Sequence, residues 1–233
     1  MPNLPYRHVS PISPRLVSVE LKANDGDPLA RVYQHGRPVQ YSYLNDELPL
    51  WSVQTVYSAR PWAVEMPSAG LPLSWSVLLE ARRRGIGLAQ VTHAAGLGST
   101  GDPTIDRLLP LPERYDVPAE TAAAIETARA TGGRIIAAGT TVVRALESAA
   151  LATGAAPAAL AAGSSTTDLV IDDRHTFSVV DGLLTGMHDP SESHFRLLSA
   201  FADQTVLLSA WTHAVDQGYH CHEFGDVSLV LTS

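Results

Sequence analysis

The residues around Gly139 are of the types that bind an anion at the start of a helix. Residues 135–138 are a short apolar run, which predicts a strand buried on both faces. Gly139 permits a tight turn, and the hydroxyl of Thr140 or Thr141 is expected to cap a helix over residues 142–152. Such a turn directs unpaired N–H groups and the positive end of a helix dipole towards one point, which suits a carboxylate or a phosphate. By spacing alone, an ordinary strand-to-helix connection without a ligand is the alternative.

Histidine supplies two further candidate sites in the last part of the sequence. His188 lies in a loop, residues 181–190, between a predicted strand and a predicted helix, where α/β proteins commonly place functional groups. A loop histidine without a task is the alternative. The run His-Cys-His-Glu at residues 220–223 would place both histidines on one face of a strand. A zinc site there would need distant ligands such as His188 or His194, and neither C-x-x-C nor H-E-x-x-H spacing accompanies it, so we predict no bound metal.

Two stretches upstream could face a flat or cationic ligand. Residues 37–58 are irregular and rich in aromatic side chains, which can stack on a base or a sulfonium; they include Tyr41, Tyr43, Trp51 and Tyr57. Packing within the core is an equal alternative for these rings. Residues 63–71 read as a turn around one acidic residue, Glu65. Residues 96–101 match G-x-G-x-x-G, but no helix begins inside this motif, so we reject a dinucleotide site.

Strands alternate with helices along the chain, which predicts an α/β fold. We expect strands over residues 16–21, 86–92, 135–138, 167–171 and 177–180, and a strand-rich tail over 219–231. We expect helices over residues 28–35, 74–84, 118–131, 142–152, 191–202 and 204–216.

Composition limits the class of protein. The 233 residues are 45% hydrophobic and 17% charged, which is typical of a globular chain. The start of the sequence lacks the profile of a signal peptide, no apolar run is long enough to span a bilayer, and a single cysteine excludes an intrachain disulfide. We therefore expect a cytoplasmic protein without a membrane partner. The net charge of −8, with fifteen arginines and one lysine, disfavours a long contact with RNA.

Residues 133–148 resemble the G-R-[VI]-I-A-x-G-T-T-x-x-R-x-L-E-S signature of the S-adenosylmethionine:tRNA ribosyltransferase-isomerases of queuosine synthesis. Other motifs of this family occur in the same order, from Pro14 to the C-terminus. They are Gln-Thr-Val-Tyr at 54–57, Met-Pro-Ser-Ala-Gly-Leu at 66–71, Glu-Arg-Tyr at 113–115, Val-Val-Asp-Gly-Leu-Leu-Thr at 179–185, Leu-Ser-Ala-Phe at 198–201 and Phe-Gly-Asp at 224–226.

The resemblance implies a main α/β domain, a mixed sheet flanked by helices, with a β-barrel domain inserted near its start. We therefore divide the chain into an N-terminal extension, residues 1–36, which could hold a barrel remnant at 16–21, and an S-adenosylmethionine-binding domain, residues 37–233. The implied activity moves the ribosyl part of S-adenosylmethionine to a 7-aminomethyl-7-deazaguanine in tRNA. The product rearranges to an epoxycyclopentanediol, with release of adenine and methionine.

Departures from the family pattern shape the predicted function. Most of the barrel is missing, and the family's A-G-L-H-F reads Ala-Gly-Leu-Pro-Leu at residues 69–73. The histidine of L-H-V-G-x-G-T-F stands one place early, at His93, and N-F-H-L-P has become Gly-Met-His-Asp-Pro at residues 186–190. With the net charge of −8, these changes predict an S-adenosylmethionine-dependent transferase or isomerase acting on a free deazapurine, a nucleoside or another small nucleophile.

Two alternatives remain. The chain could modify tRNA with the help of a partner or second subunit, although we do not expect it to bind tRNA alone. It could instead be a non-catalytic binding subunit. Either a homo-oligomer or a complex with a partner subunit is compatible with the sequence.

The resemblance also assigns roles to residues. The groups expected to bind S-adenosylmethionine, the co-substrate, are Tyr57, Met66, Ser68, Gly70, Gly139, Thr140, Thr141 and Arg144. Deprotonating the carbon beside a sulfonium requires a base, and we rank His188 first, because the ordinary pKa of histidine suits proton transfer. Glu65 is second, because an apolar wall beside Trp62 would raise the pKa of its carboxyl group. Glu223 is third and could simply anchor the tail strand.

Overall fold

The computed structural model describes residues 6–11, 17–22, 26–40, 44–63, 65–96, 102–107, 111–154, 159–221 and 224–232. The chain divides into two compact units, Met1–Val53 with Gly96–Leu111, and Gln54–Ala95 with Pro112–Ser233. The first unit thus continues past residue 36, where the sequence suggested a boundary. That this unit holds a barrel remnant stays a prediction.

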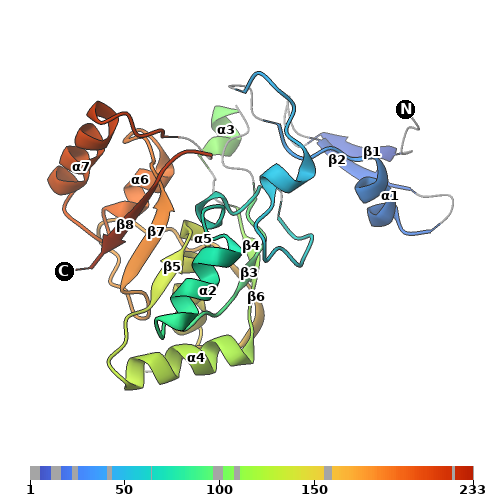
Figure 1. Ribbon diagram of the computed structural model, residues 1–233. Helices are drawn as coiled ribbons and strands as arrows, with labels where there is room; N and C mark the ends of the chain where they lie inside the picture. The colour runs from blue at the N-terminus through green and yellow to red at the C-terminus, as the bar shows by residue number, and fades with distance from the viewer. Residues whose placement is uncertain are drawn as a thin grey trace. The chain divides into compact units, whose positions relative to one another are not determined.

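The first unit contains a two-stranded antiparallel sheet, β1 (Tyr6–Pro11) with β2 (Val17–Leu21) (Figure 1). β2 agrees with the predicted strand at residues 16–21. β1 lies in a proline-containing segment for which no strand was predicted. Proline is tolerated at the end of an edge strand, and Pro11 occupies that position opposite Val17.

Helix α1 (Pro28–His35) of the same unit begins as the sequence predicts. The carboxylate of Asp27 accepts a hydrogen bond from the Leu29 N–H at 3.0 Å, and proline occupies the start of the helix, where its missing N–H costs nothing. The unit also includes a 3₁₀ turn, η1 (Leu50–Val53), and a short helix, α3 (Pro103–Asp106).

The second unit holds two three-stranded sheets with one helix packed against strands of both. One sheet is antiparallel in the order β3 (Thr92–His93), β4 (Glu113–Val117) and β6 (Gly163–Thr167). The other is mixed, because β7 (Gly182–Gly186) pairs parallel with β5 (Ile136–Ala138) and antiparallel with β8 (Val227–Leu231). Helix α5 (Thr140–Leu151) contacts strands of both sheets (Figure 1). The predicted α/β class with a mixed sheet is confirmed.

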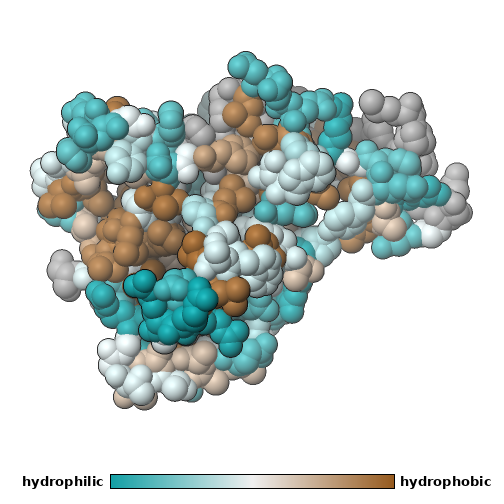
Figure 2. Space-filling view, in the orientation of Figure 1, coloured by the Kyte–Doolittle hydropathy of each residue, from teal (hydrophilic) through white to brown (hydrophobic). Residues whose placement is uncertain are grey.

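Further helices of this unit are α2 (Trp75–Arg83), α4 (Ala119–Ala130), α6 (Ser193–Leu198) and α7 (Gln204–Asp216), with a 3₁₀ turn, η2 (Ser68–Gly70). The core is centred on α5, most of whose side chains are buried, including Val143, Leu146 and Ala149. Figure 2 shows hydrophobic side chains in brown over the region of β5, β7 and β8, where Ile136 and Leu229 are exposed. In the described residues, no helix is long and apolar enough to cross a membrane.

Some predicted strands are wrong or displaced. Residues 177–180 form no strand, because the N–H groups of Val179 and Val180 donate to a buried carboxylate, that of Glu147, instead of to a neighbouring strand. The strand predicted at 86–92 is limited to β3, and the one predicted at 167–171 lies at β6. In the loop at 177–180 the apolar side chains of Val179 and Val180 are buried without pairing in a sheet, whereas Ile86 and Leu88 are exposed, so an apolar pattern alone did not identify a strand.

Candidate active site

The turn between β5 and α5 lies where the sequence predicted it. Gly139 has φ 104°, a conformation that other residues rarely adopt, and its N–H donates to the Leu184 carbonyl at 2.8 Å. Because β5 and β7 are parallel, their carboxyl ends meet at this edge of the sheet, beside the start of α5. The predicted threonine cap is wrong, because Gly139 itself occupies the N-cap position, α5 begins at Thr140, and no side chain makes a capping hydrogen bond.

The η2 turn packs against β7 and next to Gly139. A Cβ placed on Gly139 would lie 3.8 Å from that of Ala69, so the two turns are close neighbours. A Cβ on Gly70 would approach the Tyr57 hydroxyl to 2.0 Å, so only glycine allows this tyrosine to pack here. Burial raises the pKa of the Tyr57 phenol, partly opposed by a hydrogen bond with Thr55.

The predicted binding residues on these two turns therefore share one neighbourhood. They are Ser68, Gly70, Gly139, Thr140 and Thr141, with Tyr57 packed against Gly70 and Met66 two residues before η2. Their contact with S-adenosylmethionine stays a prediction.

His188 lies just beyond the carboxyl end of β7 and is held by three side chains. Its Nε2 is 2.8 Å from the hydroxyl of Thr185, its Nδ1 is 3.3 Å from the carboxylate of Glu192, and its ring stacks on that of His194 with centroids 4.7 Å apart. Because a carboxylate only accepts, we assign the ring proton to Nδ1, so that Nε2 accepts from the threonine hydroxyl. These contacts fix the orientation of the His188 ring, and its role as a base stays a prediction.

The pKa of His188 is lowered to about 4, mainly because burial disfavours the imidazolium and also because His194 is close. The sequence alone suggested an ordinary histidine pKa. At neutral pH the side chain is therefore uncharged and can accept a proton, with a smaller driving force than an unperturbed histidine has.

This lowered pKa predicts acid destabilisation of the fold. Between about pH 6.5 and 4 the unfolded chain binds a proton at residue 188 that the folded chain does not, so stability falls as the pH falls through this range. From pH 7.5 to pH 5 the contribution of His188 amounts to about 2 kcal/mol. Urea unfolding of His188→Gln is expected to lack that part of the pH dependence. An unchanged pH dependence would contradict the lowered pKa.

Among the described residues, three side chains could together hold a metal ion. The potential ligand atoms of His188, Glu192 and His194 all lie within 4.8 Å of one another. His220, which the sequence suggested as a zinc ligand, is exposed. Our expectation of no metal stays a prediction, so the unfolding experiment should be done with and without a chelator.

The other two predicted bases are Glu65, which the structure describes, and Glu223, which it does not. Glu65 is half-buried at the start of the segment that leads to η2. The guanidinium groups of Arg114 and Arg60 lie 4.8 and 5.3 Å from the centroid of the neighbouring Trp62 ring. This ring, which was expected to form an apolar wall beside Glu65, therefore contacts two cations. Glu223 lies outside the described residues, as do Tyr41 and Tyr43.

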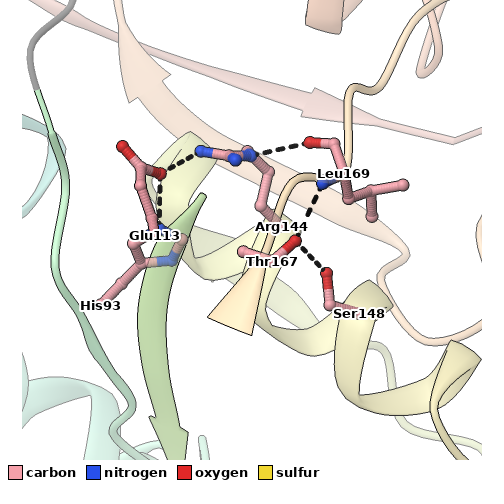
Figure 3. Close-up of polar contacts among 6 residues, drawn as sticks. All are labelled: His93, Glu113, Arg144, Ser148, Thr167 and Leu169. Atoms are coloured by element: carbon pink, nitrogen blue, oxygen red, sulfur yellow. Dashed lines mark hydrogen bonds and ion pairs between the residues drawn. The ribbon is translucent and has the colours of Figure 1, made fainter. Parts of the chain in front are cut away.

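Arg144 lies on α5, one turn beyond Thr140, and makes contacts within the protein (Figure 3). Its Nε donates to the Leu169 carbonyl at 2.9 Å and its Nη1 to the carboxylate of Glu113, whose second partner is His93 Nε2 at 2.8 Å. From the sequence, neither Glu113 nor His93 was expected to have a role. The sequence features that could have pointed to these two residues are the Glu-Arg-Tyr motif at 113–115 and the displaced family histidine at His93.

Glu147, also on α5, is fully buried and anchors a loop. Its carboxylate accepts hydrogen bonds from the N–H groups of Ser178, Val179 and Val180 at 2.9, 3.0 and 3.0 Å, and lies 3.4 Å from His175 Nε2. This glutamate holds residues 178–180 directly before β7, and thereby fixes the strand that carries Thr185 and leads to His188.

Comparisons with known proteins agree with these motifs. The family model described as queuosine biosynthesis protein matches residues 12–230. A protein of Trichlorobacter lovleyi, named S-adenosylmethionine:tRNA ribosyltransferase-isomerase, is 38% identical over 206 residues, 87% of this chain and 59% of that protein. A Thermus thermophilus protein of the same name is 36% identical over 217 residues, 91% of this chain and 61% of that protein.

A solved structure has the same fold. The crystal structure of S-adenosylmethionine tRNA ribosyltransferase from Thermotoga maritima is 31% identical and aligns with a TM-score of 0.57, over 70% of this chain and 51% of that chain. The present chain spans only part of the length of its relatives, 59% of the Trichlorobacter lovleyi protein and 61% of the Thermus thermophilus protein. From the family model, the relatives and the fold together, the chain belongs to the queuosine biosynthesis protein family.

Proposed function

We propose that this chain uses S-adenosylmethionine as the ribosyl donor in the transfer and isomerisation reaction of its family, with tRNA as the acceptor. The acceptor differs from the small nucleophile that the sequence suggested, because relatives 36% and 42% identical carry tRNA in their names. Those names make a free deazapurine or nucleoside doubtful as the natural acceptor.

The observation that carries this proposal is the meeting of three family motifs at the carboxyl ends of β5 and β7. The η2 turn, the turn at Gly139 and the loop with His188 come from distant parts of the sequence. In α/β proteins, ligands commonly bind outside the carboxyl ends of parallel strands. S-adenosylmethionine held there would be in reach of the first turn of α5, of the half-buried Tyr57 and of the uncharged His188 imidazole.

The proposed roles follow from these environments. The first turn of α5, with Thr140 and Thr141, offers N–H groups and hydroxyls that donate hydrogen bonds to the α-carboxylate, the one anionic group of S-adenosylmethionine. Tyr57 borders the same neighbourhood with its ring. His188 accepts the proton from the carbon beside the sulfonium, whose positive charge acidifies that carbon. For this step, Nε2 of His188 must exchange its hydrogen bond with Thr185 for the substrate proton.

The charge of the chain bears on tRNA binding. In the basic run at the end of α2, Arg83 and Arg84 both pair with Glu80, at 2.9 and 2.8 Å, which offsets part of their charge. With a net charge of −8, we expect the purified chain to bind tRNA only weakly, with a dissociation constant on the order of 10⁻⁴ M near physiological salt. Submicromolar binding in a mobility-shift assay would contradict this expectation.

An acceptor assay tests the proposed function. The chain is first titrated calorimetrically with S-adenosylmethionine. It is then incubated with that donor and either tRNA carrying the aminomethyl-deazaguanine or the free base, and released adenine and methionine are measured. We expect release with tRNA at a concentration high enough to offset weak binding. Release with the free base alone would favour the small acceptor, binding without release would favour a non-catalytic subunit, and absence of donor binding would refute the proposal.

A further inference from the structure

Two buried polar atoms without a partner lie in the ion cluster beneath α5. His93 and Arg144 both contact one oxygen of Glu113, Oε2 (Figure 3). Among the described residues, His93 Nδ1 and Arg144 Nη2 have no hydrogen-bond partner, and the two side chains are only 3% and 10% exposed. Unpaired polar atoms at this depth are rare in folded proteins, and they call for an explanation.

The two atoms have opposite hydrogen-bonding character. The carboxylate of Glu113 accepts from His93 Nε2, which we therefore assign as the protonated nitrogen, so that Nδ1 presents a bare lone pair. Arg144 Nη2 is a cationic donor and cannot accept. One cluster thus offers an acceptor and a positively charged donor, and each is desolvated.

We propose that this pair completes the site for the amino-acid end of S-adenosylmethionine, with Arg144 Nη2 donating to the same α-carboxylate as the first turn of α5 and His93 Nδ1 accepting from the α-ammonium group. An α-amino acid carries an anionic acceptor and a donor on one carbon, and so satisfies both atoms at once. A phosphate or a simple carboxylate would satisfy Arg144 but leave the lone pair of His93 facing another acceptor. This inference rests on the proposed function, because it places one part of the same donor molecule.

The position of Arg144 on α5 supports this placement. Residues four apart share one face of a helix, so Arg144 lies in line with Thr140 at the turn where the donor is proposed to bind. Neither orphan atom is open to solvent, so the ligand must displace the groups that cover them. Glu113 acts here as a positioning residue, because it fixes the ring of His93 and one nitrogen of Arg144.

Ligand analogues test the assignment on the unmodified chain. Calorimetric affinities are measured for S-adenosylmethionine, for its decarboxylated form, and for 5′-methylthioadenosine, which lacks the whole amino-acid end. We expect decarboxylation to weaken binding at least about tenfold, since it removes a charge-assisted hydrogen bond. Equal affinities for the first two ligands would overturn the inference and leave the proposed function standing. If none of the three binds, the proposed function itself fails.

Variants of His93 test how much this residue contributes to the affinity for S-adenosylmethionine. His93→Phe removes the hydrogen-bond acceptor Nδ1. We expect it to lower the affinity for S-adenosylmethionine at least about tenfold and to leave the affinity for 5′-methylthioadenosine unchanged. His93→Gln, whose amide can donate to Glu113 and still accept, is expected to recover most of the affinity. Arg114→Met, on the exposed side of β4, is the matched control and should change neither affinity. Equal weakening of both ligands by His93→Phe would indicate a purely structural residue and overturn its assignment. If that variant does not fold, the analogue series still decides.

Discussion

Glu147→Ala is expected to lower the free energy of unfolding by about 3–5 kcal/mol, because it removes one side of a buried polar network. The carboxylate is the acceptor for three successive N–H groups of residues 178–180, and no solvent reaches it. Its removal leaves those donors unpaired, each at a cost of about 1–3 kcal/mol if nothing replaces the acceptor, and leaves His175 without its carboxylate. Equilibrium unfolding in urea measures the loss.

Two further variants make this result specific. Glu147→Gln keeps an acceptor oxygen and nearly the same volume, so we expect it to lose less than the alanine variant. Glu126→Ala, on the exposed face of α4, removes the same side chain without unpairing a buried group and should change stability by less than about 0.5 kcal/mol. A loss below about 1 kcal/mol for Glu147→Ala would mean that water or a shifted loop satisfies the three donors.

His188→Ala is expected to reduce turnover of S-adenosylmethionine by about 10²–10⁴-fold, the usual contribution of a general base. Its affinity for the donor should stay within about twofold, because the proposed role lies in proton transfer and not in binding. Exchange of the 5′ hydrogens with deuterated solvent isolates this step and should fall in parallel with turnover. Because the pKa of His188 is lowered to about 4, its protonation should not reduce the rate between about pH 8 and 5.5.

The controls for His188 use its own neighbours. His194→Ala removes the exposed ring that stacks on His188 but no hydrogen bond of the base, so a moderate effect is expected. Thr185→Val removes the hydroxyl at Nε2 and tests whether this contact orients the ring. If His188→Ala binds the donor and still exchanges and turns over at the unmodified rate, His188 is not the base, and Glu65→Gln becomes the next variant to measure.

The unit around Gly139 could be predicted from the sequence because its signals are local. A short apolar run, a glycine and a helix-forming stretch fix a strand, a turn and a helix without knowledge of the rest of the chain. The predicted helix at 142–152 and the observed α5 differ only at their ends, where a cap was expected at a threonine and the helix instead begins after Gly139. The resemblance then assigned residues from several such turns to one ligand.

The partners of α5 could not be predicted, because they depend on long-range pairing. Glu147 reads as an ordinary helix residue, yet it accepts from a loop that begins some thirty residues later, and this loop resembles a strand in its apolar alternation. Arg144 was expected to face a ligand, and the sequence did not indicate its pairing with Glu113. His93 was noticed only as a displaced family residue. Burial and partner choice of such groups follow from topology and not from local pattern.

The packing of α5 against both sheets also bears on how the chain folds. The strands that contact this helix come from residues 92 to 186, and its charged side chains find their partners in β4 and in the loop before β7. A helix that formed early would therefore hold unpaired charges until distant segments closed over it. Folding rates fall as native contacts become more distant in sequence. The second unit is thus expected to fold slowly for its size, with α5 becoming stable only as the two sheets assemble around it.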